Sequence, residues 1–179
     1  DVAAFSDNDI VLVDIEHKVL VAVFSNSILN PNELHIKGLK DPRRIAVNKD
    51  DQLIVIDHQV VKIFNRKYEF LSQFTPGRGS NSGLICLAVD ENNLIAVGYR
   101  NKRKGPSEVS LHGANGSLIR ILPAPGIGDF LMIRTQQFTY WNGDNLHTMD
   151  YNGATVRLTN VISQPGKTQH PTGMSFISG

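Results

Sequence analysis

Cysteine is nearly absent from this chain of 179 residues, which contains only Cys86. A single thiol rules out a disulfide bond within the chain and fits a reducing compartment, so we expect a cytoplasmic protein. No apolar run approaches the length of a membrane span, so the sequence predicts no membrane partner. Lysine plus arginine (18) and aspartate plus glutamate (17) nearly balance. Any attraction to nucleic acid must therefore come from a local group of charges.

Motifs for catalysis and metal binding are also missing. The six histidines form no HxH or HExxH pattern, and the lone cysteine cannot form CxxC, so no metal-ligand spacing exists. There is no G-x-S-x-G elbow for a serine nucleophile. The Gly- and Ser-rich residues 75–83 lack the Lys-Ser/Thr ending of a phosphate-binding loop. We therefore assign no catalytic residue, no metal and no cofactor, and we expect a protein that is not an enzyme.

Short apolar runs separated by turn residues are abundant, and residues 39–74 show the pattern best. Runs at 45–47, 53–56, 60–64 and 70–74 are rich in β-branched or aromatic residues, and the gaps carry Asn, Asp or charge. This pattern predicts a four-stranded antiparallel meander. No run is long enough, or periodic enough at 3.6 residues, to favour a helix.

The same unit recurs along the chain. Counterparts of its first strand start at residues 2, 45, 87, 130 and 173, which are 42 or 43 residues apart. Four short strands in such a period are typical of a β-propeller blade. We therefore predict an all-β fold in one domain, residues 1–179. Its four-stranded antiparallel blades cover about 1–38, 39–81, 82–125 and 126–168, with 169–179 as the first strand of a fifth.

The best-formed unit resembles an NHL repeat. The resemblance rests on Pro42, the apolar strand after it, Asp51, the strand that ends at Asp57 and the strand that closes on Phe64. The first blade has Asp14 where the second has Asp57, whereas the third has Gly98 and the fourth has Trp141 at that place. We expect the recurring aspartates to have a structural role at strand ends.

The resemblance also implies a function and an assembly. It suggests a recognition module similar to the propeller of TRIM-NHL proteins, which binds RNA or protein while ligase chemistry lies in a separate RING domain. Most NHL propellers are closed rings of six blades. With four blades and one further strand, we expect this chain to associate with another copy or with a missing portion of its ring, or to close in an unusual way.

Positive charge gathers where second-to-third turns and the segments before first strands share one face of a propeller. An insertion at residues 99–108 adds four cations there, and two aromatic residues nearby are expected to stack bases. The predicted ligand is single-stranded RNA or an acidic protein surface, although charged loops are also often simply solvated. The candidate binding residues are Arg43, Arg44, His58, Tyr99, Arg100, Lys102, Arg103, Lys104 and Trp141.

One alternative belongs to another functional class. Propeller lyases and hydrolases hold a metal at the mouth of the central channel. Four carboxylates of this chain follow predicted inner strands, but they lie on the rim opposite His17 and His58. These carboxylates belong to Asp50, Asp51, Asp90 and Glu91.

Overall fold

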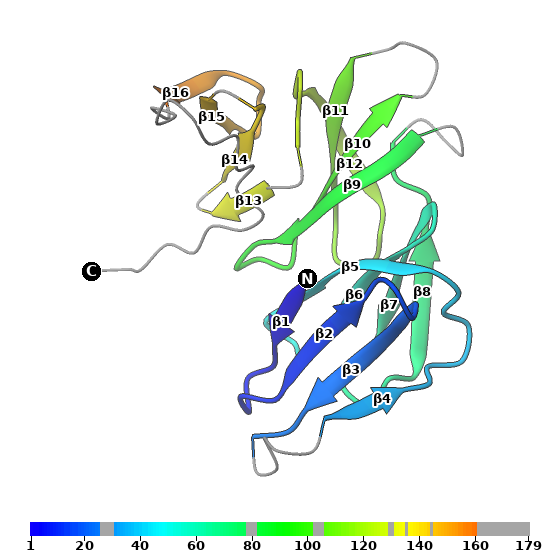
Figure 1. The fold of residues 1–179 in the computed structure, drawn as a ribbon. Coiled ribbons are helices and arrows are strands. Elements are labelled where there is room, and N and C mark those ends of the chain that lie inside the picture. The colour runs from blue at the N-terminus through cyan, green and yellow to red at the C-terminus, as the bar shows by residue number, and fades with distance from the viewer. Residues whose placement is uncertain are drawn as a thin grey trace, which may run out of the picture.

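The computed structural model describes residues 1–25, 31–77, 82–101, 106–128, 131–134, 136–143 and 145–160. It contains four four-stranded antiparallel sheets, and the strands of each sheet lie in chain order (Figure 1). No helix long and apolar enough to cross a membrane occurs in these described ranges. The all-β prediction is confirmed.

Each sheet consists of four consecutive strands. The first holds β1 (Val2–Ala4), β2 (Ile10–Asp14), β3 (Val19–Val23) and β4 (Asn32–Leu34). The second holds β5 (Pro42–Val47), β6 (Leu53–Asp57), β7 (Val60–Phe64) and β8 (Phe70–Phe74). The third holds β9 (Ser82–Val89), β10 (Ile95–Asn101), β11 (Ser107–His112) and β12 (Leu118–Pro123). The fourth holds β13 (Leu131–Arg134), β14 (Gln137–Trp141), β15 (Asn145–Asp150) and β16 (Thr155–Asn160).

The turns between first and second strands follow one plan. Between β5 and β6, the amide of Asn48 donates to the carbonyl of Gln52 (3.1 Å) and the amide of Asp51 donates to that of Asn48 (3.0 Å). Asp51 has φ of 55°, and the corresponding Asn8 and Asn93 have φ of 67° and 63°. Asn and Asp tolerate this left-handed conformation better than other residues with a side chain. The Asn and Asp residues that we predicted at these turns therefore end the strands, because they adopt the left-handed conformation that the turn requires.

The last strand of the first sheet lies earlier in the chain than predicted. We expected it at 34–36, but β4 is Asn32–Leu34. Leu34 pairs with Leu20 of β3, so continuation to Ile36 would need Lys18 as a partner. Lys18 lies in a turn with φ of 58° and cannot extend the ladder. The chain instead turns, with the amide of Ile36 bonded to the carbonyl of Leu34 (3.1 Å).

The third sheet is longer than predicted. Residues 99–108 were expected to form an inserted loop, but β10 continues to Asn101 and β11 begins at Ser107. Its first strand also starts earlier than residue 87, at Ser82. The predicted first residue of the fourth blade's first strand, residue 130, and the predicted fifth-blade strand at 169–179 lie outside the described residues.

The hydrophobic core is divided among the junctions between consecutive sheets. One cluster joins the first and second sheets through Val11, Leu20 and Val55. A second joins the second and third sheets around Ile54 and Ile95. The third lies between the third and fourth sheets and contains Cys86, Val109, Phe138 and Tyr140, among others. Each sheet therefore packs face to face on the next.

The inner edge of this arrangement is made by the first strand of each sheet. β1 contacts β5, β5 contacts β9, and β9 contacts β13. Figure 1 shows β4 and β16 at the outside of the first and fourth sheets. This is the order of strands in a propeller blade.

Candidate functional site

One rim of the molecule carries most of the candidate binding residues, and we call it the loop-bearing face. It contains the β2–β3 and β6–β7 turns and the segments that lead into β5 and β13. Backbone hydrogen bonds join two of these pieces within the second sheet and two within the fourth: the amide of His58 donates to the carbonyl of Asp41 (3.0 Å), and the amide of Gly128 donates to the carbonyl of Trp141 (2.8 Å). In these two sheets, the end of the second strand therefore lies beside the segment that leads into the first strand.

A groove of about 480 Å³ lies on this face. Three of the predicted residues line it, Arg43 and Arg44 from β5 and Arg100 from β10. The rest of its lining is glycine and aliphatic. We call it the arginine groove, and its residues are Ile15, Arg43, Arg44, Gly83, Leu84, Ile85 and Arg100.

Two irregularities in the strand pairing flank the groove. In the β5–β6 ladder, Pro42 pairs with Asp57 and Arg44 pairs with Ile56, so Arg43 is an extra residue. In the β9–β10 ladder, Cys86 pairs with Gly98 and Leu84 pairs with Tyr99, which leaves Ile85 as the extra residue. A bulge bends its strand and redirects the neighbouring side chains. Both bulges supply residues to the groove lining.

Two of the arginines are held by contacts within their own strand and the segment before it. Arg43 donates through Nε and Nη2 to Oδ2 of Asp41, at 3.0 and 2.8 Å. Arg44 donates through Nη1 to the carbonyl of Arg43 (3.0 Å). The guanidinium of Arg43 holds the pKa of Asp41 below its ordinary value, so Asp41 is charged at neutral pH.

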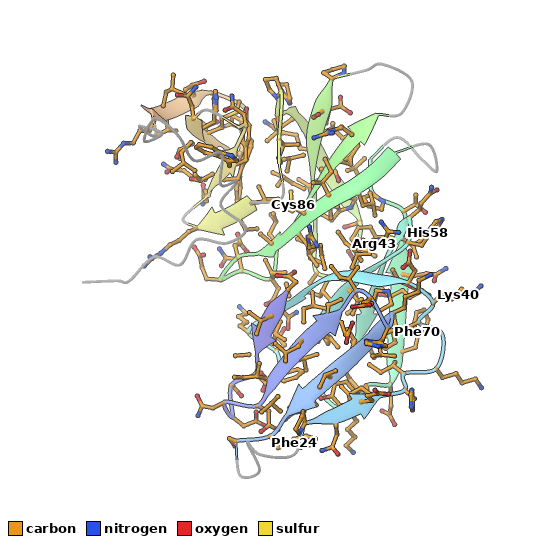
Figure 2. The ribbon with its side chains drawn as sticks, viewed as in Figure 1. Phe24, Lys40, Arg43, His58, Phe70 and Cys86 are labelled. Carbon is orange, nitrogen blue, oxygen red and sulfur yellow. The ribbon has the colours of Figure 1, made fainter. Side chains whose placement is uncertain are left out.

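His58 lies beside this ion pair. Its Nδ1 is 3.7 Å from Oδ2 of Asp41, and its side chain is 68% exposed. Figure 2 shows His58, Arg43 and Lys40 at the same end of the second sheet. Asp41 therefore lies between Arg43 and His58 and offsets part of the charge of Arg43.

Tyr99 does not have the role that we expected from the sequence. Its side chain is 1% exposed, and its hydroxyl donates to Oε2 of Glu108 (2.7 Å). A Cβ added at Gly77 would lie 2.5 Å from Cζ of Tyr99, so the segment after β8 covers the ring. The prediction that Tyr99 stacks on a base is wrong because β10 continues through this position and turns the ring inward.

Trp141 stands outside the groove lining, at the end of β14 in the fourth sheet. It is half-buried, and its Nε1 is buried without a hydrogen-bond partner. The side chain lies next to Gly128, where an added Cβ would be 3.6 Å from Cδ1 of the indole. Among the residues that the structure describes, the lining of the arginine groove therefore contains no aromatic side chain.

The remaining predicted cations belong to the β10–β11 connection. Lys102, Arg103 and Lys104 lie outside the described residues. Of the predicted insertion, only 102–106 connects the two strands. Arg100 is exposed at the end of β10, one residue before the last residue of that strand.

Carboxylates on the opposite rim accept hydrogen bonds from residues of neighbouring sheets. Oδ1 of Asp51 accepts from the amide of Ser6 (2.8 Å), which joins the first two sheets. Oδ2 of Asp90 accepts from the hydroxyl of Tyr151 (2.8 Å), which joins the last two. Asp50 accepts from the side chain of Asn93. Within the described ranges, no group of three or more His, Cys, Asp or Glu residues is placed to hold a metal ion.

The aliphatic part of the groove was not predicted. Leu84 and Ile85 precede the first strand that we expected in the third blade, so no pattern placed them beside Arg100. Ile15 was detectable, because it is an apolar residue between Asp14 and Glu16 in a polar turn, and it is 50% exposed.

Comparisons with known proteins identify the fold. No family model and no curated protein matches the sequence. Among solved structures, a streptogramin B lyase is 10% identical over 89% of this chain and 53% of its own, with a TM-score of 0.67. A chain of the mitotic checkpoint complex is 12% identical over 88% of this chain and 48% of its own, with a TM-score of 0.66. A gluconolactonase from Xanthomonas campestris is 13% identical over 92% of this chain and 62% of its own, with a TM-score of 0.64.

These similarities define the class of protein. The fold is a β-propeller of four-stranded antiparallel blades, as the repeat predicted. The chain spans about half the length of the first structures that it matches. At such low identities the similarity extends to the fold alone, because propellers support many unrelated functions.

Proposed function

We propose that this chain is a non-enzymatic recognition module, a propeller of NHL type like that of TRIM-NHL proteins, and that its arginine groove binds an acidic protein segment. The single buried thiol, Cys86, fits a cytoplasmic location. The recurrence of Asp14 and Asp57 at the ends of second strands supports the NHL assignment.

The proposal rests on the convergence of Arg43, Arg44 and Arg100 around an aliphatic floor. Guanidinium groups are planar and always charged, and they bind carboxylates and phosphates through paired hydrogen bonds. Leu84 and Ile85 add apolar surface between the charges. A groove with both features suits an acidic segment that also carries aliphatic side chains.

Two observations favour protein over RNA as the ligand. Binding of single-stranded RNA normally uses aromatic side chains on which bases stack. Tyr99 is buried and Trp141 lies outside the groove lining. Lys102, Arg103 and Lys104 still add positive charge in the sequence next to Arg100, so RNA is the competing ligand class in the test below.

The test compares a groove variant, which loses three positive charges, with a control that loses two positive charges from the opposite rim. The groove variant carries Arg43→Ala, Arg44→Ala and Arg100→Ala. The control carries Lys49→Ala and Lys67→Ala, two exposed lysines in turns on the opposite rim. Arg66 is unsuitable as a control because it pairs with Asp7 and Asp9 and its Cζ lies 4.1 Å from the ring centroid of Phe5.

Fluorescence anisotropy with a labelled peptide of alternating Glu and Leu, and with an oligouridylate, at several salt concentrations measures both ligand classes. We expect the groove variant to lose peptide binding and the control to keep it. Equal losses in the two variants contradict the proposal. Tighter binding of oligouridylate than of peptide, with a salt slope of about −0.7 per phosphate contact, favours RNA.

The alternative of a metal-dependent propeller lyase or hydrolase has less support. Asp50, Asp51 and Asp90 accept hydrogen bonds from neighbouring sheets, so metal binding would break contacts at the blade junctions. Titration with Mg²⁺, Mn²⁺ and Zn²⁺ followed by thermal unfolding tests the alternative. A saturable rise in Tm with one of these ions would favour it.

A further inference from the structure

The arginine groove brings together more positive charge than a single carboxylate requires. Three of its seven lining residues are arginines, and they come from two different sheets. We infer that the groove recognises a phosphomonoester, carried by a phosphoserine or phosphothreonine in a protein segment. This inference rests on the proposed function and specifies the ligand of the same groove.

The guanidinium groups are positioned before any ligand arrives. The carboxylate of Asp41 fixes Nε and Nη2 of Arg43, and Nη1 of Arg43 is not part of that ion pair. The carbonyl of Arg43 fixes Nη1 of Arg44 (3.0 Å). The bulge at Arg43 places two consecutive arginines at the groove. Both arginines are oriented by short contacts to residues 41–43. Preorganised donors lose less entropy when they bind an anion.

The geometry of a phosphomonoester matches this arrangement better than that of a carboxylate. A phosphorylated side chain carries a charge of about −1.5 to −2 and three acceptor oxygens that point in different directions. A carboxylate is planar, carries one charge and is satisfied by one guanidinium fork. The groove instead offers arginines from β5 and β10. A phosphodiester in RNA has one charge and two free oxygens, so it also matches less well.

The aliphatic lining indicates what accompanies the phosphate. Ile15, Leu84 and Ile85 lie along the groove with the arginines, and the volume of about 480 Å³ is within the usual range for a ligand pocket. This volume is larger than the volume that one phosphate group would occupy. We therefore assign the aliphatic part to an apolar side chain next to the phosphorylated residue.

The test uses small probes, so that it does not depend on knowing the partner's sequence. Heteronuclear NMR follows the arginine Nε–Hε resonances and the backbone amides during titration with N-acetyl-O-phosphoserine amide. The matched probes are N-acetyl-glutamate amide and N-acetyl-serine amide. The same titrations are made on the Arg100→Ala variant and on the Lys49→Ala, Lys67→Ala control.

We expect the phosphoserine probe to shift Arg43, Arg44 and Arg100 first and to bind about tenfold more tightly than the glutamate probe. This factor corresponds to one additional charge-assisted hydrogen bond. Arg100→Ala should remove most of that preference, because Arg100 is the arginine that the third sheet contributes to the described lining of the groove. The lysine control should keep it.

The outcomes separate this inference from the proposed function. Equal affinities of the phosphoserine and glutamate probes at the groove overturn the phosphomonoester and leave the acidic-segment function standing. Shifts spread equally over exposed lysines and arginines, Lys49 and Lys67 included, overturn both. A phosphate preference that survives Arg100→Ala also overturns the inference, because the third sheet then contributes nothing to it.

Discussion

At the scale of single residues, the repeated aspartate has two different environments. Asp57 is 2% exposed, pairs with Lys62, and accepts at Oδ1 from the amides of Lys40 (3.0 Å) and Asp41 (2.6 Å). Lys62 also donates to the carbonyl of Gly38. Asp14 instead bonds the amide and ring of the exposed His17, at 2.9 and 2.8 Å. Asp57 thus anchors the segment that precedes the arginine groove, whereas Asp14 only closes its own turn.

We expect Asp57→Ala to lower the free energy of unfolding by about 3–5 kcal/mol, because it leaves the Lys62 ammonium buried without a counter-ion. Urea unfolding at neutral pH measures the loss. Adding Lys62→Met should recover part of it, and Asp14→Ala, the equivalent change at an exposed site, should have little effect. A similar loss for Asp14→Ala would contradict the assignment.

His112 makes a prediction about pH. Burial lowers its pKa, and the carbonyl of Gly116, which accepts from Nδ1 (3.1 Å), offsets this only partly. Since Nδ1 carries the proton, Nε2 accepts from the hydroxyl of Ser110 (2.9 Å). The contribution of neutral His112 to stability is therefore complete above about pH 6.5, the unfolded value, and is lost as the pH falls through the lower folded pKa.

Urea unfolding between pH 7.5 and 5 should accordingly show a steeper loss of stability for the parent than for His112→Gln. The comparison between the two proteins matters, because Asp14 raises the pKa of His17 and so gives that residue the opposite dependence. Identical pH profiles would show that His112 has the same pKa in the folded and unfolded protein, and would contradict the prediction.

At the scale of the elements, Gly98 explains one departure from the repeat. The strand register aligns Gly98 with Val13 and Ile56, and aligns Tyr99 with Asp14 and Asp57, so the sequence-based placement of Gly98 at the aspartate position is wrong. An added Cβ at Gly98 would lie 2.4 Å from Sγ of Cys86 and 2.8 Å from Cδ1 of Ile127. No side chain fits there without moving the core between the third and fourth sheets. The third sheet therefore has glycine where the first two sheets have Val13 and Ile56, and the side chains of Cys86 and Ile127 fill the space.

We predict that Gly98→Ala lowers the free energy of unfolding by about 1–3 kcal/mol through overpacking. Cys86→Ala, made in the same protein, removes the nearest atom. The double variant should therefore lose less stability than the two single changes together, which chemical unfolding of all four proteins measures. Additive losses would indicate that Cys86 and Gly98 do not press on each other.

Alternating apolar residues and Asn or Asp turns were sufficient to predict the elements of the second sheet, where β7 and β8 match the expected runs. They were insufficient for β10, because Arg100 and Asn101 look like loop residues while the backbone continues its ladder with β9. For the candidate site, Arg43, Arg44 and Arg100 were predicted together from topology. The inward turn of Tyr99 was not, because it depends on the register shift after Gly98.

At the scale of the whole molecule, the first and second sheets differ in how their equivalent faces are covered. Val2 pairs with Leu12 in the first sheet as Ile45 pairs with Val55 in the second. Ile45 and Val55 are 3% and 0% exposed because they pack on the preceding sheet, whereas Val2 and Leu12 are 59% and 37% exposed. An apolar sheet face of this kind is a surface for association.

We predict that the chain associates through this face, with another copy of itself in a solution of the pure protein. Sedimentation velocity over a concentration series should show Leu12→Glu shifting the protein to the monomer. Ile119→Glu changes a residue that is 57% exposed on the outer strand β12 and should leave association unchanged. A parent protein that is monomeric at all concentrations would refute the prediction.

The division of the core by junction has a consequence for ancestry. Because each hydrophobic cluster belongs to one pair of adjacent sheets, gaining or losing one blade changes a single junction and leaves the others intact. The stability of such repeats is nearly a sum of units and nearest-neighbour contacts. Gene duplication or deletion can therefore change the array by one blade at a time. The core residues of each remaining junction stay under selection to pack on each other.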